Sequence, residues 1–94
     1  MSYVELDYVL SIPKMEEKLR SLTRTSTARI VELDTARLFI ELLMQENGLD
    51  PKKLIIRGCA LKKHTFNLTI GGEGEKFYAL GRLLDQVSSL EPPS

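Results

Sequence analysis

The sequence is short of the residues that most often mark a catalytic or metal site. It has one cysteine, one histidine and no tryptophan among its 94 residues. A lone Cys59 cannot close an intrachain disulfide, which fits an intracellular protein, cytoplasmic or nuclear. One cysteine and one histidine also fall short of the four ligands of a structural zinc site. We therefore expect no metal, no cofactor and no enzymatic activity.

Cys59 and His64 are the one pair that could supply a thiol and a base. They are only five residues apart, so a tight hairpin could bring them together. The simpler interpretation is that Cys59 is a small buried residue and that His64 lies in a basic turn. We predict no catalytic residue.

Long apolar runs are also missing. Leu38–Ile40 holds three residues and no run holds more than four, whereas a helix that spans a bilayer needs about 20. The first ten residues include Glu5 and Asp7 and lack a basic leader, so we expect no signal peptide. The sequence predicts no membrane partner.

Neither sign of charge is in excess, since 13 basic residues balance 13 acidic ones. This balance excludes a uniformly basic nucleic-acid-binding protein. The charges nevertheless come in blocks. Residues 18–31 and 51–72 hold four and five basic side chains with no acidic one, and the segments around them are acidic. Basic loops and hairpins can contact phosphates, which gives the following candidate nucleic-acid-binding residues: Arg24, Arg29, Lys52, Lys53, Arg57, Lys62, Lys63 and His64.

The first third of the chain reads as a strand followed by a helix. Apolar residues alternate with polar ones over 3–12, which is the period of a strand. A capping box formed by Ser2 and Glu5 would instead begin a short helix; we prefer the strand. Pro13 predicts the first turn of a helix of about ten residues, and Ser11 is the expected cap of that helix. Residues 23–27 should connect it to the next element.

Residues 28–33 allow two interpretations. They could form a strand, with Asp34 capping the helix that follows. Alternatively, Ser26 or Thr27 caps one long helix that reaches Asn47, where Asn47 and Gly48 form a left-handed end. We favour the long helix, because its residues have good helix propensity.

The second half of the chain predicts a hairpin and a closing helix. Residues 54–57 form a short strand, and Gly58 marks a bulge. A turn over 61–65 leads to a strand at 65–70, followed by a helix over 77–87 and a disordered tail at 91–94. The segment 71–74, Gly-Gly-Glu-Gly, lacks the further residues of a dinucleotide or phosphate loop, so we expect a glycine turn with acidic capping.

These elements predict a single α+β domain over residues 1–90. It has a small, mostly antiparallel sheet of about three strands with helices on one face. The element order is β-α-α-β-β-α, or β-α-β-α-β-β-α if 28–33 is a strand. The first order is similar to that of type I KH domains, which bind single-stranded nucleic acid. Their signature GXXG lies between the first two helices, where this chain has Thr23-Arg24-Thr25-Ser26. This resemblance therefore implies that nucleic-acid binding was lost or works differently.

One helical segment is apolar on most sides. A surface helix normally carries one apolar stripe, whereas 38–44 is interrupted only by Glu41. We therefore expect a non-enzymatic protein-interaction or adaptor module, a subunit of a homo- or hetero-oligomeric complex. Its predicted partner interface consists of Leu38, Phe39, Ile40, Leu42 and Leu43. The alternative is a nucleic-acid-binding protein that uses the basic hairpin and the 24–29 connection.

Overall fold

The structure, a computed structural model, describes residues 2–89 of the chain. Its elements are β1 (Val4–Ser11), α1 (Ile12–Thr23), α2 (Leu33–Glu46), a short 3-10 helix η1 (Pro51–Lys53), β2 (Ile55–Leu61), β3 (Thr65–Gly72) and α3 (Glu75–Asp85). The predicted α+β class and the order β-α-α-β-β-α are confirmed. The predicted tail at 91–94 lies outside the described residues.

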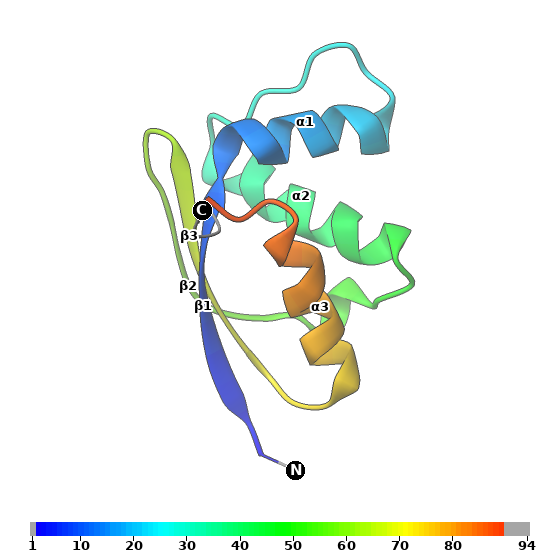
Figure 1. Cartoon of the computed structure of the whole chain (residues 1–94), viewed down its shortest axis with the longest axis vertical. Coiled ribbons are helices and arrows are strands. Elements are labelled where there is room, and N and C mark those ends of the chain that lie inside the picture. Colours follow the sequence, from blue (N-terminus) through cyan, green and yellow to red (C-terminus); the bar gives the residue numbers. More distant parts are fainter. Residues whose placement is uncertain (1, 90–94) are drawn as a thin grey trace, which may run out of the picture.

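The three strands form one antiparallel sheet in the order β1-β3-β2. The central strand β3 pairs with both neighbours, so β1 and β2 are the edges. All three helices lie on the same side of the sheet (Figure 1). Apolar residues of β1 and β3 face the helices and are buried, among them Leu10, Phe66, Leu68 and Ile70. The other face of the sheet carries polar side chains and is open to solvent.

The α1 helix begins as the sequence predicts. Ser11 has an extended backbone, and its Oγ accepts a hydrogen bond from the Lys14 N–H at 3.3 Å. Pro13 lies in the first turn, where its missing N–H has no helical partner to lose. Met15 and Leu19 then fall on the buried side of the helix. A polar cap and an amphipathic stripe therefore suffice to define α1.

The connection between α1 and α2 contradicts both interpretations of 28–33. α2 begins only at Leu33, so the long helix is wrong, and residues 28–31 form no strand. Ile30 explains the difference, because its side chain is buried in the core. The carboxylate of Glu16 also accepts a hydrogen bond from the Ile30 N–H at 2.8 Å. Tertiary contacts thus replace the helical hydrogen bond that this residue would otherwise make.

The end of α2 and the hairpin follow the sequence more closely. Gly48 has a positive φ of 75°, and the Leu49 N–H donates to the Met44 carbonyl at 2.8 Å, which closes the helix. β2 is longer than its predicted four residues and runs to Leu61. Its pairing with β3 shifts between Ile56 and Gly58, so the predicted irregularity at this point is confirmed.

α3 packs closely on β1 at a glycine. A Cβ atom on Gly81 would lie 2.5 Å from the Tyr8 hydroxyl oxygen, so any larger residue would require the tyrosine ring or the helix to shift. Burial raises the pKa of the Tyr8 phenol above its ordinary value, and the nearby negative charge of Asp85 adds to this effect.

Candidate docking surface along β2

The structure divides the predicted partner interface on α2. Phe39, Ile40 and Leu43 are completely or almost completely buried inside the single chain. Leu42 is half-buried, and Leu38 is 51% exposed. Three of the five predicted residues therefore belong to the core. Of the predicted interface, Leu38 and part of Leu42 remain accessible to a partner.

The basic residues of 51–72 lie along β2 and at both of its ends. Lys52 and Lys53 are exposed in η1, directly before the strand. Lys62, Lys63 and His64 are exposed in the turn that follows it. Seven residues of strand, about 23 Å at roughly 3.3 Å per residue, separate the two groups.

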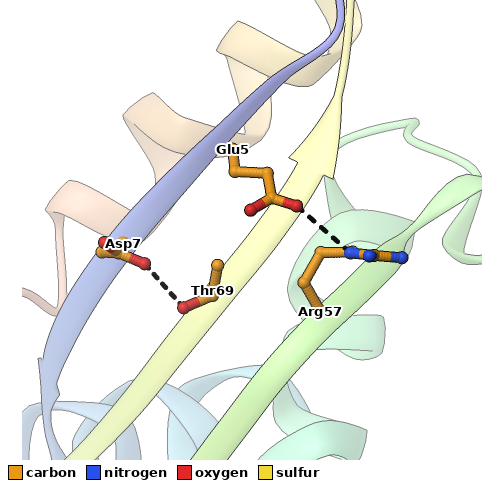
Figure 2. A network of polar contacts seen from close by, with 4 residues as sticks. All are labelled: Glu5, Asp7, Arg57 and Thr69. Atoms are coloured by element: carbon orange, nitrogen blue, oxygen red, sulfur yellow. Dashed lines mark hydrogen bonds and ion pairs between the residues drawn. The ribbon is translucent and has the colours of Figure 1, made fainter.

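The other candidate cations stand apart from these two groups or are already paired. Arg24 and Arg29 are exposed in the connection between α1 and α2. Arg57 lies in the middle of β2, and its Nε donates to the Glu5 carboxylate at 3.2 Å across the open face (Figure 2). Because the side chains of both residues are about half exposed, this ion pair adds little to stability. The negative charge of Glu5 nevertheless makes the middle of β2 less positive than its two ends.

The open face around this ion pair is polar. Figure 2 shows the Asp7 carboxylate on β1 accepting a hydrogen bond from the Thr69 hydroxyl on β3, at 2.6 Å. Glu5 and Asp7 thus place two carboxylates on the face that a ligand of β3 would meet. Such a face does not suit a polyanion.

The outer edge of β2 has unpaired backbone groups. The Lys62 N–H donates to the Thr65 carbonyl at 2.8 Å, which fixes the alternation of the ladder from the turn onward. Ala60 and Gly58, opposite Asn67 and Thr69, then point their peptide groups at β3. The peptide groups of Cys59 and Leu61 point away from the sheet. No other strand of residues 2–89 pairs with this edge.

The edge of β1 differs, because the end of the described chain covers part of it. The Ser11 N–H donates to the Val87 carbonyl at 2.7 Å, and the Ser89 N–H donates to the Val9 carbonyl at 2.9 Å. These bonds place residues 87–89 beside the last part of β1, with a bridge between Leu10 and Ser88. β2 is therefore the edge that stays open along its whole length.

β2 is also unusually apolar for an open edge. Arg57 is the only charged residue among its seven, and Ile55 is 45% exposed. Ile56, Cys59 and Leu61 are half-buried and pack against the core from the helix side. The helix in contact with β2 is α2, which carries the exposed Leu38. We refer to the outer side of Ile55–Leu61 as the β2 edge.

The pair of Cys59 and His64 does not form a site. Cys59 lies opposite Leu68 within the sheet and packs against the core, whereas His64 is exposed in the turn. The His64 carbonyl accepts a hydrogen bond from the Ile12 N–H at 3.0 Å, which ties the turn to the start of α1. Within residues 2–89, no group of three or more His, Cys, Asp or Glu side chains gathers as a metal site would need.

A pocket of about 320 Å³ opens beside the glycine segment 71–74. Its lining is partly apolar and includes Met44, Leu54 and Phe77. Glu73 and Glu75 line it as well, next to the first turn of α3. They place negative charge at the positive end of the helix dipole, where an anionic ligand would be repelled. The predicted glycine turn over 71–74 is only partly right, because Gly71 and Gly72 are paired residues of β3. The chain turns at Glu73 and Gly74, which has a φ of 87°, and no side chain caps the helix.

No helix within residues 2–89 is both long enough and apolar enough to cross a bilayer. No family model, curated protein or solved structure matches the chain. The element order remains the one that type I KH domains have, with no glycine at Thr23–Ser26.

Sequence reasoning did not identify the β2 edge. The basic block at 51–72 and the apolar residues of β2 were both visible in the sequence. Strand order was not visible, because β1 could equally have paired with β2. The sequence does hold one signal: β2 carries a single charged residue, Arg57, whereas β1 carries Glu5 and Asp7.

Proposed function

We propose that this protein is a non-enzymatic interaction module, a subunit of a homo- or hetero-oligomeric complex, and that it binds a partner chain along the β2 edge. The observation that carries this proposal is a seven-residue, largely apolar strand whose outer side no other strand of residues 2–89 pairs with. We also expect the module to act inside the cell, in the cytoplasm or the nucleus, since it has a single cysteine.

An open apolar edge supports this role, because it is a liability for a protein that works alone. Unpaired N–H and C=O groups template pairing with other chains, and proteins usually protect such edges with charges or bulges. Here the irregularity at Arg57 protects the first part of β2, while Gly58–Leu61 carry no charge. Addition of a partner strand is a common way to satisfy such an edge.

The exposed part of α2 extends the same proposal. Leu38 lies on the helix that contacts β2 and is one of the large apolar residues that the single chain leaves exposed. A partner strand along β2 would carry side chains on its helix side. Leu38 would offer these side chains an apolar contact in addition to Ile56, Cys59 and Leu61.

Nucleic-acid binding is the second candidate, because the lysines at both ends of β2 have no acidic neighbour within 51–72. The geometry supports it less well. The open face beside the β2 edge carries the carboxylates of Glu5 and Asp7, which would repel phosphates. The exposed aromatic residues, which would stack on bases, include Tyr3 and Tyr78 but none in β2.

The proposal is tested by measuring the mass of the assembly that the wild type and the edge variants form. The double variant Ile55→Lys, Ala60→Lys places two charges on exposed positions of β2, as natural edges often do. Val9→Lys is the matched control, since Val9 is a similarly exposed residue of β1, whose carbonyl accepts a hydrogen bond from the Ser89 N–H. All three proteins are purified under native conditions and measured by native mass spectrometry.

We expect the wild type and Val9→Lys to have at least twice the mass of one chain, or to carry a second polypeptide. The β2 double variant should be a free monomer. If the double variant keeps the same assembly as the wild type, the β2 edge is not the interface. A second pair, Leu38→Lys against Tyr78→Lys, tests α2 in the same way, since both residues are about half exposed.

A further inference from the structure

We propose that the β2 edge takes, by strand addition, an extended protein segment whose two ends are acidic and whose middle is uncharged. This inference rests on the proposed function and names the partner's chemistry. It follows from the distribution of charge along a strand whose outer backbone groups are free.

The backbone of β2 sets the form of the partner. The N–H and C=O groups of Cys59 and Leu61 point away from the sheet, in the alternating pattern of an antiparallel ladder. Only a polypeptide backbone offers both donors and acceptors at this spacing. The occupant is therefore an extended peptide, and about seven residues match the length of the strand.

The charges set the partner's ends. Lys52 and Lys53 precede the strand, Lys62 and Lys63 follow it, and all four are exposed. No carboxylate lies within 51–72, and none of these four ammonium groups is paired with a carboxylate in residues 2–89. Asp50, Glu73 and Glu75 line the same pocket as Lys53, so the Lys62–Lys63 end is the more positive of the two. A segment with acidic residues at both ends would still meet two exposed lysines at each end of β2, whatever its direction.

The middle of the partner should be uncharged. Arg57, the one cation within β2, already donates to Glu5. A carboxylate in the middle of the partner would therefore meet a guanidinium that already has a carboxylate partner, whereas the lysines at the ends of β2 have none within residues 2–89. On the helix side, Ile56, Cys59 and Leu61 favour apolar side chains. A central run of β-branched residues fits both faces.

The test uses a synthetic probe with the sequence acetyl-Glu-Glu-Val-Thr-Val-Thr-Val-Glu-Glu-amide, labelled with fluorescein, and measures its binding by fluorescence anisotropy. One control peptide carries lysine in place of each glutamate. A second control is N-methylated at its five central residues, which removes the donors needed for strand addition. A single-stranded deoxythymidine ten-mer reports nucleic-acid binding.

The protein variants reverse charge at each end of the strand. Lys52→Glu, Lys53→Glu and Lys62→Glu, Lys63→Glu change two exposed lysines each. The matched control is Lys76→Glu, Arg82→Glu, which makes the same change in net charge on α3. All six residues are exposed, so none of these variants removes a core contact.

We expect the acidic probe to bind and both control peptides to fail. Each double reversal along β2 should weaken binding by about ten-fold, and the α3 control should leave it unchanged. Salt should weaken binding as well, because the screening length falls from about 10 Å at 0.1 M to about 3 Å at 1 M. Amide exchange at Cys59 and Leu61 should slow when the acidic probe is bound.

Three results would overturn the inference, and each has a different consequence for the proposed function. If lysine-ended and acidic probes bind equally, the edge takes strands without regard to charge, and the proposed function stands. If no peptide binds, the inference is wrong, and the masses of the β2 variants decide the proposed function independently. If the deoxythymidine ten-mer binds more tightly than the acidic probe and depends on the same lysines, the basic ends serve nucleic acid.

Discussion

At the scale of single residues, Gly81 of α3 packs closely against Tyr8 of β1. Glycine in the middle of a helix normally lowers stability by about 1 kcal/mol relative to alanine. Here the Tyr8 hydroxyl occupies the space that a Cβ would need, while the Tyr8 Cζ atom would lie 3.7 Å away, an ordinary contact. The Tyr8 hydroxyl oxygen is therefore the atom that a Cβ at position 81 would clash with.

This geometry predicts that Gly81→Ala depends on the residue at position 8. In the wild type the substitution should be neutral or destabilising, because the new methyl group displaces the tyrosine ring. In the Tyr8→Phe background it should stabilise by up to about 1 kcal/mol, the helix-propensity gain. Urea unfolding of the four proteins gives the coupling energy as a double-mutant cycle.

Tyr78→Phe is the control for this cycle, because Tyr78 is an exposed tyrosine on the same helix. It should not change the effect of Gly81→Ala. Additive free energies for Gly81→Ala and Tyr8→Phe would show that the hydroxyl does not set the distance between α3 and β1.

At the scale of elements, the connection between α1 and α2 is held by a side chain rather than by its own propensity. The Ile30 side chain is buried, and its N–H is satisfied by the carboxylate of Glu16. A hydrogen bond to a charged acceptor is stronger than one between neutral groups. This hydrogen bond also prevents Ile30 and its neighbours from extending α2 toward its N-terminus, although their helix propensity favours such an extension.

We therefore predict that Glu16→Ala lowers the free energy of unfolding by about 1–3 kcal/mol, because it leaves the Ile30 N–H without its partner. Glu17→Ala is the control, since Glu17 is exposed and one position along the same helix. Chemical denaturation measures both. The exchange rate of the Ile30 amide should rise in Glu16→Ala only, and equal stability of the two variants would contradict this role for Glu16.

At the scale of the whole molecule, the sheet has one edge partly covered and one edge open. β3 is bonded on both sides, β1 is bridged at its end by residues 87–89, and β2 has a free outer side. Backbone protection should therefore be uneven across three strands that share one core.

Hydrogen exchange in dilute solution, resolved by residue, should show this asymmetry. The amides of Ala60 and Gly58 face β3 and should exchange only when the strand opens. The amides of Cys59 and Leu61 face outward and should exchange much faster in the free chain. Equal protection of Cys59 and Ala60 in a sample shown to be monomeric would contradict the open edge.

Most of the local structure could be predicted because its causes lie close together in the sequence. Ser11 and Pro13 start α1, Gly48 ends α2, and the alternation over 65–70 gives β3. The segment 28–32 could not be predicted, because Glu16 and the core compete there with helix propensity. The same limit applied to the apolar α2 helix, since the sequence cannot say whether Phe39 and Ile40 meet a partner or the chain's own sheet.

The sequence by itself determined the class of the fold, the element order and the alternating blocks of charge, because periodicity, caps and charge are properties of neighbouring residues. Only the tertiary structure decided which strands form the edges of the sheet and which apolar residues the single chain already buries. Strand order depends on contacts between segments far apart in the chain, such as β1 with β3, and no local pattern encodes them. The net charge is zero, with 13 positive and 13 negative side chains, yet the fold places two pairs of lysines at the two ends of an open strand.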